Sequence, residues 1–317
     1  MIVSMKSIYK KIFKSTNSWI ILIALFIAVL LSIMSPVFLS VTNFQNILKQ
    51  VSITALIAAG MTLVIISGGI DLSVGSIVAL SGVAIATSIR SGVPEILGIG
   101  LGIGVGTFIG ILNGIIISLG NLPPFIATLG MMGMARGLAL VITKAESFAV
   151  VTPLIMKIGT TKLFGLPISI VIVGIVYILF SYILNQMRFG RYVYVIGGNE
   201  EAARLSGINV VKQKIKIYAL SGAVSALAAV IMVGRLYSAP PTSASGAELD
   251  AIAAVIIGGT SFSGGIGTIS GTLIGALIMS ILANGFNLMN ISSFWQQFFI
   301  GAIIIFSVWI DNLRHNK

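Results

Sequence analysis

Four charged residues lie far from the polar ends of this sequence, and they are the first candidates for chemistry. Asp71 is the only charged residue between Val51 and Ile89, Arg136 lies in another apolar stretch, and Glu248 and Asp250 precede a long uncharged run. Charged residues inside membrane spans usually mark a substrate path or a proton relay. A relay needs a chain of titratable groups, and these four residues are too few and too scattered to form one.

The sequence contains no pattern that supports catalysis. It lacks the GxxxxGK[ST] loop that cradles nucleotide phosphates, so we expect no ATPase site. With no cysteine and one histidine, His315, it cannot build a thiolate site, a zinc site or a Ser–His relay within the membrane. We therefore predict that the chain is not an enzyme and binds no metal or cofactor. A channel or secondary carrier remains an alternative.

The composition places the chain in a lipid bilayer. Its 317 residues are 57% hydrophobic and 9% charged, with a mean hydropathy of +1.09, whereas soluble domains carry roughly 25% charged residues. The net charge of +11 would suit a nucleic-acid partner. However, the basic residues lie at the ends of apolar runs, where membrane topology and anionic lipid account for them. We predict a single all-α transmembrane domain over residues 1–317.

Uncharged runs that are too long for one span predict helices broken at glycines. As one helix, residues 51–89 would be about 60 Å long, twice the ~30 Å hydrocarbon core. The break is predicted at residues 67–69, and others at residues 120–124, 258–265 and 284–293. Residues 250–258 are short for a span and form either a half-helix or a tilted, glycine-interrupted helix. The total is about ten spans. Close helix packing is predicted at Gly98, Gly100, Gly102, Gly104, Gly106 and Gly110.

Two of the broken segments resemble each other. "VIISGGIDLSVGSIVALSG" (residues 64–82) is similar to "VIIGGTSFSGGIGTISGTL" (residues 255–273). Internal symmetry with broken spans is typical of transporters. The alternative is that two turns rich in glycine and serine are alike through composition alone.

The basic residues predict the orientation of the chain. Residues 1–18 form a basic tail before an apolar run that starts at Trp19, and no clear cleavage site follows that run. The polar loop over residues 188–216 holds six further basic residues. With an even number of spans, the tail, this loop and the C-terminus all lie in the cytoplasm, as the positive-inside rule requires.

The polar loop contains a predicted short helix, "NEEAARLSG". Asn199 is placed as its N-cap, Glu200 and Glu201 lie in its first turn, Arg204 follows, and Gly207 ends it. Such a helix has little to bury by itself. It is either a capped surface helix that links two spans or a docking element for a soluble partner.

The same loop carries a family resemblance. Glu201-Ala202-Ala203 and then Gly207 match the E-A-A-x-x-x-G core of the loop in permease subunits of ABC importers, although the later Leu-Pro of that pattern is missing. Four stretches resemble the ribose-type sugar ABC permease family. They are "GMTLVIISGGIDLSVGS", "PPFIATLGMMGMARGL", "YVIGGNEEAARLSGI" and "ELDAIAAVIIGGTSFSGGIGTISGTLIGAL". The resemblance runs from about Ser35 to the C-terminus.

The resemblance implies a permease subunit of an ABC importer in the bacterial plasma (inner) membrane. It implies two permease chains, as a homodimer, around a path for a monosaccharide, with ribose as the first candidate. An extracytoplasmic binding protein would deliver the sugar, and a separate ATPase subunit would bind ATP and Mg²⁺. Alternatives are xylose, galactose, a nucleoside or a furanose-like signal. The implied ATPase-coupling residues are Gly198, Asn199, Glu200, Glu201, Ala202, Ala203, Arg204 and Gly207.

The candidates for the substrate path rest on residue type. Asp71 is interpreted as a turn and helix cap or as a gate, and Arg136 as a carbonyl or ion-pair partner or as a substrate contact. Amides in spans can contact a sugar or bond neighbouring helices. Phe294, Trp295, Phe298 and Phe299 suit an interface belt or stacking on a sugar ring. The full set of path candidates is Asp71, Asn113, Arg136, Asn284, Asn287 and Gln296.

Overall fold

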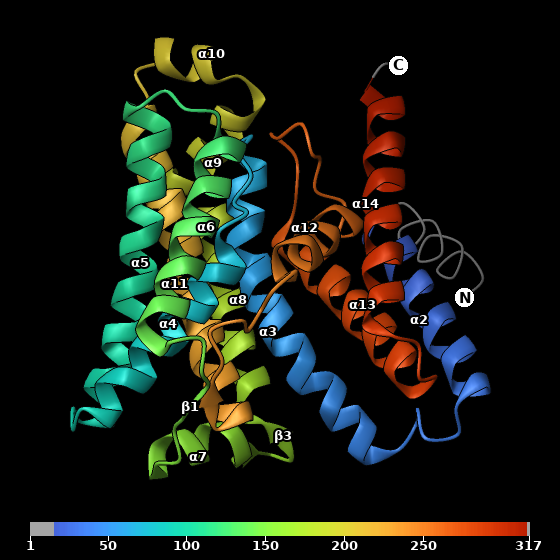
Figure 1. Ribbon diagram of the computed structural model, residues 1–317. Coiled ribbons are helices and arrows are strands. Elements are labelled where there is room, and N and C mark those ends of the chain that lie inside the picture. The colour runs from blue at the N-terminus through green and yellow to red at the C-terminus, as the bar shows by residue number, and fades with distance from the viewer. Residues whose placement is uncertain (1–15, 316–317) are drawn as a thin grey trace, which may run out of the picture.

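The chain folds into a bundle of helices with two minimal two-stranded sheets (Figure 1). The computed structural model describes residues 16–315. The helices are α2 (Thr16–Met34), α3 (Val41–Ile66), α4 (Val74–Arg90), α5 (Glu95–Leu119), α6 (Pro124–Thr143), α7 (Pro153–Thr160), α8 (Ile168–Gln186), α9 (Arg188–Gly198), α10 (Glu200–Leu205), α11 (Val210–Leu236), α12 (Ala247–Ile257), α13 (Ile269–Leu288) and α14 (Ser293–His315). The antiparallel strand pairs are β1 (Phe148–Ala149) with β4 (Ser238–Ala239), and β2 (Lys162–Leu163) with β3 (Leu166–Pro167).

The apolar helices confirm the predicted all-α membrane fold. Six helices are long and apolar enough to cross a bilayer, namely α3, α5, α6, α8, α11 and α13. Shorter apolar stretches lie in α2, α4 and α14. Helix α12 has 11 residues, about half the length that a span requires, as predicted for residues 250–258. The tenth apolar element is therefore a half-helix.

The helices run between two ends of the molecule, which we call the α10 end and the α7 end (Figure 1). Helix α14 finishes at the α10 end. Helix α12 lies midway between the two ends, and the chain reaches it from the α7 end through residues 237–246. The predicted loop over residues 188–216 is mostly helical, because α9, α10 and the start of α11 fall within it. Most of the predicted basic tail lies outside the described residues.

Glycines on one face of α5 bring its backbone against α11. A Cβ atom on Gly106 would lie 2.8 Å from the carbonyl oxygen of Gly222, and one on Gly114 would lie 2.5 Å from the Cα atom of Ile215. Bundles in lipid gain little from hydrophobic association, so small residues that allow such contact stabilise the pair. Gly100 and Gly104 face open space, so the packing role predicted for these two glycines is wrong. Only glycines four residues apart share the α11 face.

We predict opposite effects for two alanine substitutions in α5. Gly110→Ala should destabilise the protein by about 1–3 kcal/mol, because the new methyl group would meet the backbone carbonyl of Tyr218. Gly104→Ala should be neutral or stabilise by up to about 1 kcal/mol, since its methyl group meets nothing and alanine favours helix. Thermal unfolding in detergent measures both variants. Equal destabilisation by both variants would show that α5 does not pack on α11 through the glycines on this face.

Candidate functional site

Helix α10 forms a small raised surface at one end of the molecule (Figure 1). Asn199 is its N-cap, and the Asn199 side chain accepts a hydrogen bond from the N–H of Ala202 at 2.9 Å. Gly207 has a φ of +80° just beyond its end. Both features confirm the predicted boundaries. Ala203 is buried against Ile196 and Val210 and holds the helix to α9 and α11.

The charged residues of α10 are in different situations. Glu200 is engaged within the chain, because its carboxylate lies 2.7 Å from Nζ of Lys214 and 3.7 Å from the guanidinium of Arg204. Glu201 is exposed and no ion pair holds it within the described residues. Leu205 is 82% exposed at the end of the helix. Sequence reasoning missed Leu205, although an apolar residue beside two acidic ones on a short helix was a readable signal.

Three glycine-containing segments meet directly below α10. They are the α3–α4 turn, the end of α9 and the α12–α13 loop. The N–H of Gly265 donates to the carbonyl oxygen of Ile66 at 2.8 Å. A Cβ atom on Gly264 would lie 2.9 Å from the carbonyl oxygen of Gly197 and 3.1 Å from the Cα atom of Gly68. We call these contacts the glycine junction. It joins the two segments whose sequences resemble each other.

Asp71 lies in a fully buried polar cluster next to this junction. Its Oδ1 atom accepts hydrogen bonds from the N–H of Ser73 at 3.0 Å and from the Ser73 hydroxyl at 2.5 Å. Its Oδ2 atom accepts from the hydroxyl of Ser221 on α11 at 3.0 Å. Asn113 on α5 donates to the Ser73 hydroxyl at 2.8 Å. The cluster therefore ties the α3–α4 turn to α5 and α11.

Of the two residues that could cap the helix after this turn, Asp71 and Ser73, the structure places Ser73 at the N-cap position. Helix α4 begins at Val74, its N-cap residue is Ser73, and no side chain caps it. Asp71 is 0% exposed and bonds the serine that precedes the helix. The predicted turn itself is confirmed. The gate interpretation of Asp71 and the path role of Asn113 stay predictions.

Arg136 anchors the segment that leads into α12. Its Nη1 atom donates to the carbonyl oxygens of Pro241 at 2.8 Å and Ser243 at 2.7 Å. This arrangement corresponds to the interpretation of Arg136 as a partner of backbone carbonyls. The contact fixes where α12 begins, and α12 carries Glu248 and Asp250 in its first turn.

Besides Asn113, three candidate amides each pair with another amide side chain. Asn284 on α13 exchanges two hydrogen bonds with Asn43 on α3, at 3.0 and 2.8 Å. This buried pair joins two helices, which is the commoner use of amides in spans. Asn287 accepts from Nε2 of Gln296 at 3.0 Å on an exposed face.

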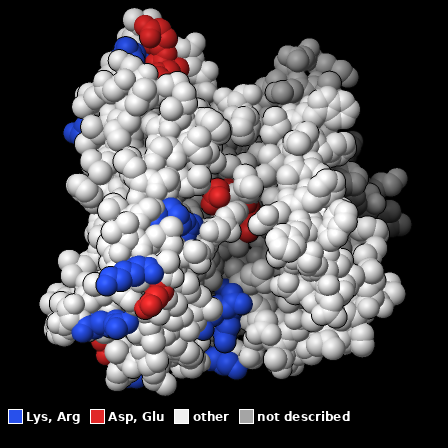
Figure 2. Space-filling view, viewed as in Figure 1, with Lys and Arg blue, Asp and Glu red and all other residues white. Residues whose placement is uncertain are grey.

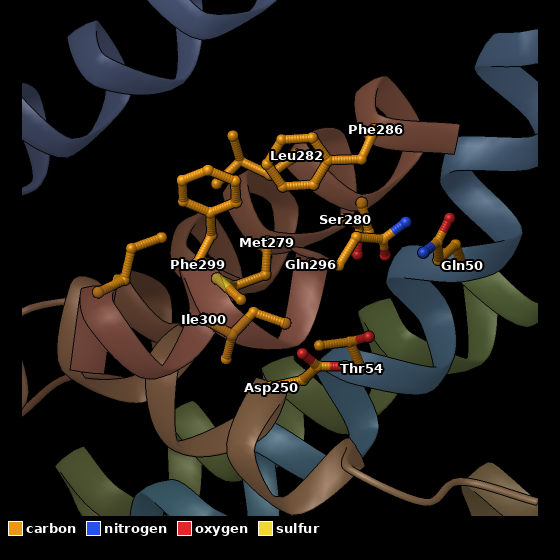
Figure 3. A pocket seen from close by; sticks show the side chains of 12 residues that line it. Gln50, Thr54, Asp250, Met279, Ser280, Leu282, Phe286, Gln296, Phe299 and Ile300 are labelled. Carbon is orange, nitrogen blue, oxygen red and sulfur yellow. The ribbon is translucent and has the colours of Figure 1, made fainter. Parts of the chain in front are cut away.

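A pocket lies between α3, α12, α13 and α14 (Figure 3). It contains about 390 Å³ that protein atoms leave empty, part of it open to the outside. Figure 3 shows Thr54 and Asp250 close to one another, and Gln50 and Gln296 facing each other from α3 and α14. Only Gln296 was among the predicted path residues. The remaining lining residues are Met279, Ser280, Leu282, Ala283, Phe286, Phe299, Ile300 and Ile303.

Charged side chains also occupy the middle of one face of the molecule. Figure 2 shows a hollow there with acidic and basic side chains in it, and further charged side chains lie toward the bottom of the view. Charges at the height of the hollow are too costly to face lipid. The hollow therefore faces water or another protein chain. Within residues 16–315, no group of three or more His, Asp or Glu side chains is placed to hold a metal ion.

Comparison with known proteins relates these features to a family. The model of the family described as "Branched-chain amino acid transport system / permease component" matches residues 43–308. The ribose import permease protein RbsC of Escherichia coli K12 is 44% identical over 94% of this chain and 96% of its own length. RbsC of Bacillus subtilis 168 is 47% identical over 92% of each chain. The L-arabinose transport system permease protein AraH of E. coli K12 is 37% identical over 96% of this chain and 93% of its own. No solved structure matches the chain.

The Asp71 cluster leads to a prediction on stability. Asp71→Ala should lower the free energy of unfolding by about 2 kcal/mol or more, because it leaves the hydroxyls of Ser73 and Ser221 buried without their acceptor. Asp71→Asn should stay near wild type, since its carbonyl can accept from Ser73 and its amide can donate to Ser221. Thermal unfolding in detergent compares the two. An Asn variant as unstable as the Ala variant would mean that the negative charge itself is required.

Proposed function

The chain belongs to the family of branched-chain amino acid transport system permease components, and from this premise we propose that it is the membrane subunit of an ABC importer for ribose. As a permease component it contains no ATPase domain of its own. The observation that carries the proposal is identity of 44–47% to ribose import permeases over more than nine-tenths of the chain. The arabinose permease of E. coli is less similar, at 37%.

The α10 surface suits a contact with the ATPase subunit. Glu201 and Leu205 point away from the bundle, and Glu200 holds α10 to α11 through Lys214. An exposed leucine beside a carboxylate is the kind of small apolar anchor with a charged rim that protein partners recognise. We assign contact with the ATPase to Glu201 and Leu205, with Ala202 and Arg204 beside them. Gly198, Asn199, Ala203 and Gly207 shape the helix and its ends.

The glycine junction supports a mechanical route from α10 to the pathway. Gly197 and Gly198 end α9, Asn199 begins α10, and both glycines contact the turns below. A displacement of α10 would therefore press directly on the α3–α4 turn and the α12–α13 loop. For ATP to drive transport, these contacts must differ in free energy between the inward-open and outward-open states.

A second copy of the chain would complete the pathway. The central hollow carries charged side chains at the height of α12, where lipid contact is unfavourable (Figure 2). A homodimer in which two such hollows face each other encloses these charges in an aqueous path. This arrangement places the path beside α12, with an extracytoplasmic binding protein at the α7 end.

The basic residues support an orientation. The loop over residues 188–216 and the two terminal tails hold twelve of the 19 basic residues, so we place the α10 end and both termini in the cytoplasm of a bacterium. The C-terminal helix α14 finishes at this end (Figure 1).

Reconstitution tests the function. Proteoliposomes that contain the chain, its ATPase subunit and its binding protein should accumulate labelled ribose only with ATP, and more strongly than arabinose, xylose or galactose. Without the ATPase subunit, uptake should fall to the background of empty liposomes. Uptake that persists without the ATPase would identify a secondary transporter or a channel instead. Accumulation of another sugar in place of ribose would show that ribose is not the substrate.

Substitutions on α10 test the coupling surface. Glu201→Lys and Leu205→Asp should each lower ATP-dependent uptake by roughly tenfold or more, because they place a repulsive or desolvated charge in the interface. Leu205→Met keeps an apolar side chain and is the matched control. Membrane insertion is measured by the amount of folded protein on size-exclusion chromatography. Wild-type uptake by both charged variants would remove α10 from the ATPase interface.

A further inference from the structure

We propose that the pocket between α3, α12, α13 and α14 binds a neutral cyclic polyol, in the size class of an aldopentose, as a contact site on the transport path. This proposal rests on the proposed function and adds residues to it. Of the listed path candidates only Gln296 lies in this pocket, and Phe299, for which stacking on a sugar ring was one interpretation, lies there too. Its lining includes Asp250, which the sequence singled out as a charged residue but not as one of the path candidates.

One wall of the pocket offers polar groups that are free to bind. Among the described residues, no hydrogen bond or ion pair engages the carboxylate of Asp250, and none engages the side chains of Gln50 or Thr54 on α3. Ser280 on α13 is 2% exposed and its hydroxyl has no partner in the described part of the chain. A buried polar atom without a partner is costly. A bound molecule with hydroxyl groups would supply these partners.

The opposite wall is apolar and aromatic. The rings of Phe286 on α13 and Phe299 on α14 stack with centroids 5.6 Å apart and planes 21° apart. Ile300 and Ile303 continue this wall. A sugar ring carries C–H groups on its faces and hydroxyls at its rim. A pocket with acceptors on one side and ring faces on the other matches this distribution.

The charges of the pocket exclude an amino acid as the better ligand. A zwitterionic amino acid would bring an ammonium group that Asp250 could pair with, but its carboxylate would find no partner, because the pocket lining contains no Lys or Arg. Arg136 is not among the lining residues, and it donates to the carbonyls of Pro241 and Ser243. A neutral polyol brings no unpaired carboxylate and donates hydroxyl hydrogens to Asp250, which makes charge-assisted hydrogen bonds. The lining of this pocket therefore favours binding of a sugar over binding of an amino acid.

The absence of cysteine makes a direct test possible. Ala283→Cys on α13 and Ile303→Cys on α14 each place one thiol in the pocket, and Ser147→Cys places one on an exposed loop outside it. In the purified permease, without ATPase or binding protein, D-ribose should slow methanethiosulfonate modification of the pocket thiols and leave Ser147→Cys unaffected. L-leucine at the same concentration should not protect. Two reporter cysteines are used so that the test still works if one of the substitutions disturbs the fold.

Asp250→Asn in the same background tests the assigned residue. The ribose concentration for half-protection should rise about tenfold, since the charged acceptor of the sugar hydroxyls becomes a neutral amide that binds them less strongly. Glu146→Gln, on an exposed loop, makes the same chemical change outside the pocket and should leave protection unchanged.

Three results would overturn the site. These are no protection by ribose at either reporter, equal protection in Asp250→Asn and wild type, and protection by leucine in place of ribose. The uptake assay distinguishes failure of the pocket proposal from failure of the proposed function. A complex that imports ribose while both pocket thiols stay unprotected contradicts only the site. A complex that fails to import ribose contradicts the function itself.

Discussion

The hydrogen bond from the N–H of Gly265 to the carbonyl oxygen of Ile66 is the contact on which the rest of this structure depends. A helix that ends inside a membrane protein leaves carbonyl groups that water cannot satisfy. Here the last carbonyl of α3 is satisfied by the loop that connects α12 to α13. Gly197 packs on the same carbonyl from the end of α9, so close that any side chain would separate the segments. Two broken helices and the surface helix α10 thus share one fixed point.

The position of the half-helix α12 follows from contacts at its two ends. The glycine junction holds its C-terminal loop, and Arg136 holds the carbonyls of residues 241 and 243 before its N-terminus. With only 11 residues, α12 cannot span the bilayer. It therefore presents its first turn at mid-height, where Glu248 faces Gly75 of α4 and Asp250 faces the pocket. One short element supplies carboxylates to both sides of the molecule.

Much of the fold was predictable, and less of the site. The breaks at residues 67–69, 120–124 and 258–265 could be located because uncharged runs were too long for one bilayer crossing. The boundaries of α10 were predictable from Asn199 and Gly207, since capping is local chemistry. By contrast, Asp71 was interpreted from its neighbours in sequence, while its partner Ser221 lies on α11, 150 residues away. Gln50, Thr54 and Ser280 were not identified, because nothing in their sequence neighbourhoods distinguishes them from residues that only pack.

By itself, the sequence determined that this chain lies in a membrane, how its spans divide, and that residues 199–207 form a capped helix. These properties depend on composition and on contacts within a few residues, where the bilayer thickness and helix geometry leave one solution. The tertiary structure decided which glycines meet a neighbouring backbone, whether Arg136 meets carbonyls or a ligand, and which polar groups share a pocket. Those outcomes depend on which faces of distant helices touch. In lipid that choice is made by close packing of small residues, which composition alone does not encode.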